Sequence, residues 1–460
     1  MNRTMKIFFS LILFLPIINY RAQTVIQDRD NKISEMINEI SSENLERIVK
    51  TLVSFKTRHS LSTQNDDKVG IGAAARWIKS QFDEYAKYAN GRLITEIDYF
   101  EVEPDERRIN RKVNLMNVMA ILKGTNSNDD RVFIVGAHFD SRAEDIMDSV
   151  IDAPGANDDL SGVAAVMELA RIMSKREFPS TIIFAAFSGE EQGLYGSTHL
   201  AKRVKENKIT GIQNCNLIAM LNNDMIGNTL SSETLLRDNI HVRVFSENIP
   251  ANESPEDERI RKLSGSEYDG KSRQLARYIK EIGERYVDQI QVKLIFRSDR
   301  FLRGGDHTPF NRLGYAAVRF CEMNENYDHQ HQNVRIENGK QYGDLPEFID
   351  FEYARKITAI NCAVLANLAL APSSPENVII DVKELTNKTK LQWSLPSKGK
   401  KPFGYYVLMR ETYQPFWEKK FFVKDTSILL PYSKDNYFFA VQSVDEEGHE
   451  SLPVFPVPQR

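Results

Sequence analysis

Short, almost continuous apolar runs recur through residues 43–370 and alternate with segments in which apolar residues return every three or four positions. The short runs lack the alternation of a half-exposed strand, which is typical of strands covered on both faces by helices. The helical spacing is clearest over residues 43–55 and 73–85, and Ser161 is placed to cap a helix over 161–175. Alternating strands and helices predict a three-layer α/β domain around a mostly parallel sheet. The predicted buried strands are residues 118–122, 132–137, 182–187, 217–221, 292–296 and 316–320.

Two stretches of the same region do not fit this alternation. Residues 23–40 look like a polar lead-in to the first helix, and residues 228–271 are polar and rich in charge. We interpret the second stretch as an insertion or long excursion from the α/β domain.

The pattern changes at residues 372–375, which read Pro-Ser-Ser-Pro and form a linker signal. Short strands follow, and Trp393 and the run 437–441 resemble the core strands of a fibronectin type III domain. A segment of this length and strand spacing suits a small β-sandwich. The sequence therefore predicts an α/β domain over 23–371 and a fibronectin type III-like sandwich over 372–460. The predicted sandwich strands are residues 378–382, 390–393, 404–410, 421–423, 427–430 and 437–444.

Residues 1–22 have the organisation of an export signal. Arg3 and Lys6 precede the apolar run 7–18, and Ala22 offers a small residue for cleavage. The run is too short to span a bilayer comfortably, and no later apolar stretch is long enough to be a transmembrane helix. An uncleaved anchor is the alternative. We expect a secreted or periplasmic protein without stable membrane insertion.

Composition narrows the class of partner. The chain has 460 residues, of which 41% are apolar and 27% charged, as in ordinary globular proteins. Its formal net charge is −4, so no basic field attracts nucleic acid. Three widely spaced cysteines, Cys215, Cys321 and Cys362, do not make a disulfide framework.

Polar residues that can bind a metal follow three of the predicted strands directly. In open α/β sheets, ligands bind outside the carboxyl ends of the strands, so these side chains should share one crevice. The residues at the three strand ends are His138, Asp140, Glu190, Glu191 and Asp224.

A glycine-containing loop that leads into the next predicted helix adds Asp158 and Asp159 to this crevice. Carboxylates at this density repel one another unless protons or cations neutralise them. Imidazole together with carboxylate suits zinc, although manganese or cobalt would also fit. Taken singly, His138 would be a structural histidine, and Glu190 and Glu191 a solvated turn. Their joint occurrence at successive strand ends favours a metal site.

Four short motifs occur in a fixed order along the chain. They are His-Phe-Asp at 138–140, Gly-Ala-Asn-Asp-Asp at 155–159, Ser-Gly-Glu-Glu-Gln-Gly at 188–193 and Asn-Asp-Met at 223–225. This set resembles the co-catalytic zinc aminopeptidase family of the clan MH metallopeptidases, which includes bacterial leucyl aminopeptidases. The family is related to glutamate carboxypeptidase II and to glutaminyl cyclases. The likeness covers residues 43–370.

The resemblance implies two zinc ions and a set of ligands. Asp158 would bridge the two ions. His138 and Asp224 would complete the first site, and Glu191 would bind the second ion.

The resemblance also implies the catalytic base. Glu190 would be the general base that takes a proton from water held between the ions and delivers it to the leaving amine. Asp140 would orient His138 and fix its tautomer from behind.

The second ion needs a histidine, for which two regions compete. The family supplies it from a His-x-x-x-Asp pattern, which His329 matches with Asn333 in place of the aspartate. We choose His329 as this ligand. His331 is the alternative, and His307 ranks third. Asp306 and His307 resemble the family's Ser-Asp-His segment, which lies beside the substrate, so both are expected to contact substrate.

These inferences predict a secreted zinc-dependent exopeptidase, an aminopeptidase acting on peptide substrates. A glutaminyl cyclase with one zinc is an alternative on the same fold. A carboxypeptidase would need a cationic pocket, for which Arg297, Arg300, Arg303 and Arg319 are candidates. A non-catalytic binding protein is the remaining alternative. The β-sandwich either contacts cell-surface material or simply packs on the α/β domain.

Overall fold

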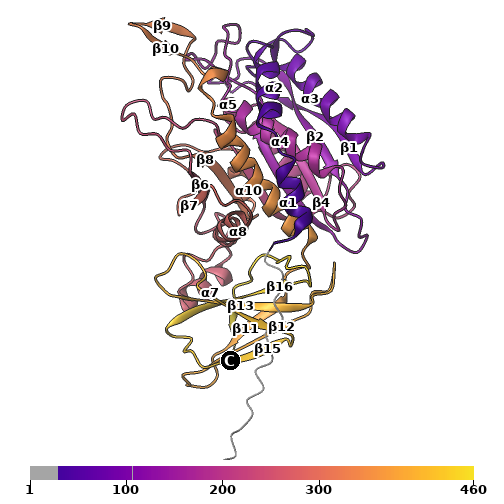
Figure 1. The fold of residues 1–460 in the computed structure, drawn as a ribbon, viewed down its shortest axis with the longest axis vertical. Coiled ribbons are helices and arrows are strands. Elements are labelled where there is room, and N and C mark those ends of the chain that lie inside the picture. The colour runs from indigo at the N-terminus through magenta and orange to yellow at the C-terminus, as the bar shows by residue number, and fades with distance from the viewer. Residues whose placement is uncertain (1–28, 106, 460) are drawn as a thin grey trace, which may run out of the picture.

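The computed structural model describes residues 29–105 and 107–459, which form two domains (Figure 1). The export signal expected over residues 1–22 lies outside the described residues. Within the described ranges, no helix combines the length and the apolar character needed to cross a membrane.

Eight strands form the central sheet of the larger domain. They are β1 (Leu93–Val102), β2 (Val113–Leu122), β3 (Arg131–His138), β4 (Thr181–Phe187), β5 (Asn216–Asn223), β6 (His241–Ser246), β7 (Gln291–Ile295) and β8 (Ala317–Glu322). Their order across the sheet is β1-β2-β4-β3-β5-β8-β6-β7. The central strands β4, β3, β5 and β8 are parallel, whereas β2 and β6 join them antiparallel. Each of the six predicted strands is present.

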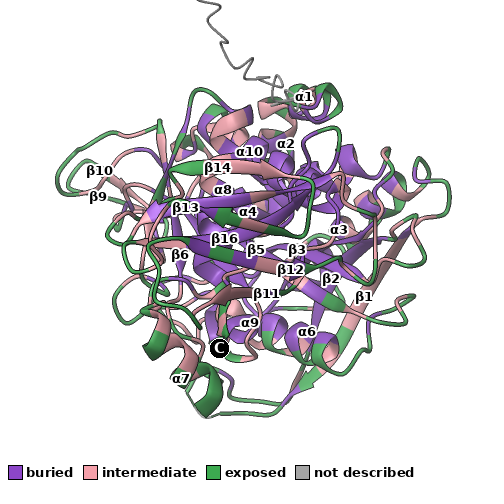
Figure 2. Ribbon diagram, turned by 90° about the horizontal axis from the view of Figure 1, so that it is seen from below, coloured by how far each residue is buried: buried purple, intermediate pink, exposed green. Residues whose placement is uncertain are grey.

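Helices cover both faces of this sheet, which makes the predicted three-layer α/β/α domain. Figure 2 shows α8 and α10 on one side and α6 and α9 on the other. The larger apolar core lies under the first group and a smaller one under the second. The first group is α1 (Asn31–Asn38), α2 (Ser42–Val53), α3 (Gly70–Ala86), α4 (Leu160–Met173), α8 (Lys271–Tyr286) and α10 (Phe351–Leu370). The second group is α6 (Tyr195–Lys205) and α9 (Thr308–Arg312).

Three expectations about this domain are wrong. The lead-in over 23–40 contains α1, whose Ile33, Met36 and Ile37 are buried. The charged stretch 228–271 contributes β6 to the sheet as well as the exposed helix α7 (Pro255–Ser264).

The third correction concerns the cap of α4. The helix begins at Leu160, and its cap is Asp159, whose carboxylate accepts from the Gly162 amide over 3.1 Å. Ser161 lies inside the first turn and donates instead to the Asn157 carbonyl.

The smaller domain is the expected sandwich of two sheets. One sheet has the order β15-β12-β11-β17 and the other β14-β13-β16. Trp393 packs edge-on against Tyr405 at a centroid distance of 5.2 Å, and residues of both sheets share one core. The strands are β11 (Glu376–Asp381), β12 (Thr389–Ser394), β13 (Gly404–Glu411), β14 (Lys419–Val423), β15 (Ser427–Leu430), β16 (Tyr437–Val444) and β17 (Val457–Gln459).

The sandwich packs on α8 through buried charged contacts. Arg410 on β13 donates to Asp269 over 2.7 and 2.9 Å, and Arg277 on α8 donates to the same carboxylate over 3.1 Å. A second contact places Arg285 and Lys420 on either side of the buried Glu450, at 2.8 and 2.7 Å. The two domains therefore meet in a specific interface as well as through the linker.

Candidate metal centre

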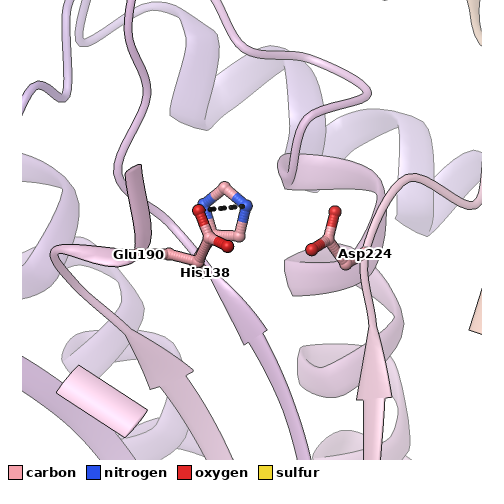
Figure 3. Close-up of side chains that lie close together, drawn as sticks. All are labelled: His138, Glu190 and Asp224. Carbon is pink, nitrogen blue, oxygen red and sulfur yellow. Dashed lines mark ion pairs between the residues drawn. The ribbon is translucent and has the colours of Figure 1, made fainter. Parts of the chain in front are cut away.

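Three neighbouring strands end at the same edge of the sheet and carry the predicted side chains there. His138 is the last residue of β3, and Asp224 follows β5. Glu190 begins the short helix α5 (Glu190–Gly193) just beyond β4. The parallel register aligns the ends of β3 and β4, because His138 pairs with Phe187, the last residue of β4. Figure 3 shows the side chains of His138, Glu190 and Asp224 close together, with Glu190 Oε2 4.0 Å from His138 Nε2.

Two groups of metal-competent side chains are formed at this edge. The ligand atoms within each group lie within 4.8 Å of one another. The first group is His138, Glu190 and Asp224, and the second is Asp158, Glu191 and His331.

Asp158 belongs to the second group and also faces the first. Its Oδ1 is 3.2 Å from His138 Nε2, and its Oδ2 is 3.1 Å from His331 Nε2. Gln330 also donates to Oδ2 over 2.8 Å. One carboxylate therefore faces both groups, as a bridging ligand does.

The structure places His331, and not His329, in the second group. The ring of His329 stacks on Phe348 at a centroid distance of 3.7 Å, away from the second group. Burial lowers the pKa of His329 to about 4. His331 lies in the position that we expected for His329, with its Nε2 3.0 Å from Glu191 Oε1. His331 has a left-handed backbone (φ 56°) inside an irregular turn, so no regular spacing in the sequence gives its direction.

Asp140 supports the centre in a different way from the one expected. The contact to His138 Nδ1 at 3.2 Å is made by the Asp140 backbone carbonyl, and the carboxylate is 3.7 Å away. That carboxylate accepts from the backbone amides of Glu190 and Glu191, each over 3.2 Å. Asp140 thus fixes the start of α5 as well as the imidazole.

Asp344 is a supporting residue that the sequence did not reveal. Its buried carboxylate accepts from the backbone amides of Asn157 and Asp158 over 2.8–2.9 Å. Burial raises the pKa of Asp344 to about 7. Asp344 fixes the loop that carries Asp158. The two residues are far apart in the sequence, so no local pattern predicts this contact.

The structure buries both residues expected to contact substrate. Asp306 and His307 are each 0% exposed. His307 Nε2 lies 2.8 Å from the Ser298 carbonyl. The pocket wall is formed instead by the preceding residues, Leu302 to Gly304.

Comparison with known proteins identifies the family. Residues 117–341 match the model described as Peptidase family M28. A probable zinc metalloprotease of Leptosphaeria maculans is 44% identical over 430 residues, which cover 93% of this chain and 97% of the relative. The chain belongs to peptidase family M28. A probable zinc metalloprotease of Pyricularia oryzae is 41% identical, over 93% of this chain and 85% of the relative.

Solved structures share the fold of this M28 peptidase. The LapA aminopeptidase of Legionella pneumophila superimposes with a TM-score of 0.52 and 19% identity, covering 76% of this chain and 78% of LapA. The aminopeptidase of Aneurinibacillus sp. strain AM-1 gives a TM-score of 0.50 and 16% identity, covering 73% and 95%. The protein is therefore a zinc metallopeptidase, a hydrolase of peptide substrates, on the aminopeptidase fold.

The M28 centre concentrates negative charge in a buried place. Burial raises the pKa of Glu190 well above its ordinary value, and Asp224 and Glu191 reinforce the effect against His138. Burial likewise raises the pKa of Asp159, and repulsion from Asp224 adds to this effect. Imidazole nitrogens and carboxylate oxygens are ligands that zinc accepts. The donor set thus fits zinc, whose charge would offset the repulsion.

A pocket of about 290 Å³ opens onto the M28 centre. Asp158, Glu190, Glu191 and Asp224 line it. Gly193, at the end of α5, and Leu194, the next residue, line it as well. The metal-competent carboxylates therefore face the space where a peptide would bind.

Proposed function

We propose that the protein is an exported aminopeptidase that uses two zinc ions to hydrolyse N-terminal peptide bonds. The position of Asp158 carries this proposal, because its two oxygens face His138 on one side and His331 on the other, at 3.2 and 3.1 Å. A single-ion site has no need for such a carboxylate. Export rests on the signal pattern of residues 1–22.

The chain's own residues would hold the ions as two overlapping sets. His138, Asp158 and Asp224 would hold one ion, and Asp158, Glu191 and His331 the other. When bound, a zinc pair polarises the scissile carbonyl and lowers the pKa of water.

Glu190 is the side chain placed to move the proton. It lines the pocket, and its side chain is 14% exposed, against 4% for Asp224. Its carboxylate could accept a proton from water and return it to the leaving amine. Hydrogen bonds from the α5 amides to Asp140 keep its backbone in place.

The pocket supports an exopeptidase rather than an endopeptidase. Its volume of about 290 Å³ lies just below the range of about 300–1,000 Å³ that is typical of small-ligand sites. Such a pocket accommodates the end of a peptide better than its middle. The aminopeptidases that share the fold favour the N-terminal end.

Zinc analysis combined with a substrate panel tests the proposal. We expect about two zinc ions per chain and hydrolysis of free aminoacyl amides, with no hydrolysis of their N-acetylated forms. One zinc per chain and cyclisation of N-terminal glutamine would indicate a glutaminyl cyclase. Cleavage only at a free C-terminus would indicate a carboxypeptidase.

A further inference from the structure

The wall of the pocket is rich in arginine. Four arginine side chains line it, and the carboxylates that line it all belong to the two metal-competent groups. The arginines are Arg108, Arg142, Arg300 and Arg303.

Two of these arginines already have carboxylate partners behind the wall. Arg300 lies 2.8 Å from Glu325 and 3.1 Å from Asp299. Arg303 shares Glu325 at 3.6 Å and donates to Gln330 Oε1 over 3.1 Å. Their charge is therefore largely compensated within the protein.

Arg108 has no such compensation within the described residues. Its guanidinium donates to the Glu191 backbone carbonyl over 2.7 Å, which is a neutral acceptor. Asp105 holds its backbone, because Asp105 Oδ1 accepts from the Arg108 amide over 2.8 Å. Tyr195 in turn donates to Asp105 Oδ2 over 3.0 Å. Asp105 and the Glu191 carbonyl thus position Arg108 at the pocket.

Arg142 contacts two side chains, Glu191 and His331, that are proposed to bind zinc. Its Nε is 3.2 Å from Glu191 Oε2, and its Nη2 is 2.7 Å from His331 Nδ1. A guanidinium can only donate, so His331 accepts at Nδ1. A neutral histidine that binds zinc through Nε2 carries its proton on Nδ1. If zinc were bound there, a proton on His331 Nδ1 would preclude this hydrogen bond, and the Arg142 donor would be available to a ligand in the pocket.

The proposed zinc pair would change the net charge of the pocket lining. Four lining carboxylates would be offset by two divalent ions. Arg108 and Arg142 would then face the pocket as uncompensated cations. Arginine forks match carboxylates in a two-bond geometry that strengthens binding.

We infer that the pocket binds a carboxylate of the substrate through Arg108 and Arg142. This inference rests on the proposed function and deepens it by naming the substrate class, which is peptides with a carboxylate next to the cleaved bond. The carboxylate is either an acidic side chain or the free C-terminus of a dipeptide.

Isosteric substrate pairs test the inference and separate the two sources. Glu-Ala-amide against Gln-Ala-amide, and Ala-Glu-amide against Ala-Gln-amide, probe the acidic side chain. Ala-Ala against Ala-Ala-amide probes the C-terminal carboxylate. We expect kcat/KM to be at least about tenfold higher for the carboxylate member of one or more pairs, as for a hydrogen bond to a charged group.

The variant R108Q assigns the preference to the pocket wall. Arg108 contacts only a backbone oxygen there, so the replacement leaves no carboxylate unpaired. We expect the carboxylate-to-amide ratio of kcat/KM to fall at least about fivefold, with zinc content unchanged. The control is R107Q, on the same exposed loop but away from the pocket lining, and its ratio should stay at the wild-type value.

Equilibrium binding gives a readout that does not need turnover. Glutarate and its neutral isostere glutaramide are titrated into the zinc-loaded wild-type, R107Q and R108Q proteins. We expect glutarate to bind at least about tenfold more tightly than glutaramide to the wild type, and R108Q to lose most of this difference.

The outcomes distinguish the two proposals. Equal kcat/KM within every pair, or equal binding of glutarate to R107Q and R108Q, overturns the inference and leaves the peptidase proposal standing. Absence of hydrolysis of every panel substrate overturns the proposed function, and the glutarate titration then decides the carboxylate site independently.

Discussion

Arg319 donates through Nη2 to Asp224 Oδ1 over 2.8 Å, and both side chains are buried. The second nitrogen, Nη1, reaches Asp299 over 3.1 Å. Burial raises the pKa of Asp224, and Arg319 opposes this shift. Arg319 therefore holds one oxygen, Oδ1, of a proposed zinc ligand in place.

Replacing Arg319 with methionine should destabilise the protein strongly. The change leaves the buried Asp224 without its arginine partner and removes one of the two arginines paired with the buried Asp299, which costs about 3–5 kcal/mol of unfolding free energy. Urea denaturation of the zinc-free protein measures the effect. The matched control is R355M, because Arg355 pairs with Glu352 on the surface. Its effect should stay within about 1 kcal/mol, and equal stabilities of the two variants would contradict the argument.

Glu190 and Glu191 are adjacent residues with different proposed roles, so their glutamine variants form a matched pair. E190Q should lower kcat at least about a hundredfold because the base is lost, while zinc content stays at the wild-type level. E191Q should lose zinc from one site. Zinc content and kcat measured on the same samples separate the two effects. Loss of zinc from E190Q would make Glu190 a ligand instead of the base.

The two candidate histidines give opposite expectations. H331A removes a proposed ligand and should weaken zinc binding at one site by more than about a hundredfold, beyond the effect of losing a residue that only orients a ligand. H329A removes the stacking partner of Phe348 and should keep both ions. Zinc titration with a competing chelator measures both affinities. The reverse result would make His329 the ligand, as the sequence pattern predicts.

Asp445 should make stability depend on pH in the acid range. Burial raises its pKa, but hydrogen bonds from His449 and Lys400 outweigh this and lower it to about 2. Because the unfolded carboxyl has a pKa of about 3.9, its contribution is complete above that value and is lost as the pH falls toward 2. The contribution is at most about 2.6 kcal/mol.

The variant D445N isolates this contribution. Urea denaturation between pH 6 and pH 2.5 should give a shallower fall in unfolding free energy for D445N than for the wild type. The control D435N changes an aspartate in a solvent-exposed turn of the same domain. Parallel curves for D445N and the wild type would contradict the shifted pKa.

The sequence by itself determined the architecture and most of the centre. Fully buried strands need continuous apolar runs. A carboxylate or imidazole that directly follows such a run therefore lies at the edge of the sheet where the strand ends. The positions of His138, Glu190 and Asp224 along the chain therefore suffice to predict that they lie together. The short strands after residue 375 predicted the second domain for the same local reason.

The tertiary structure decided what local patterns do not encode. An irregular turn directs His331, not His329, to the second group, because left-handed backbone breaks any regular spacing. Strand β6 lies in a charged segment whose pattern is overridden by pairing with β8. Asp344 and Arg319 support the centre across 186 and 95 residues of chain, respectively. Hydrophobic periodicity reports burial along a segment, whereas a partner so distant is fixed only when the chain has folded.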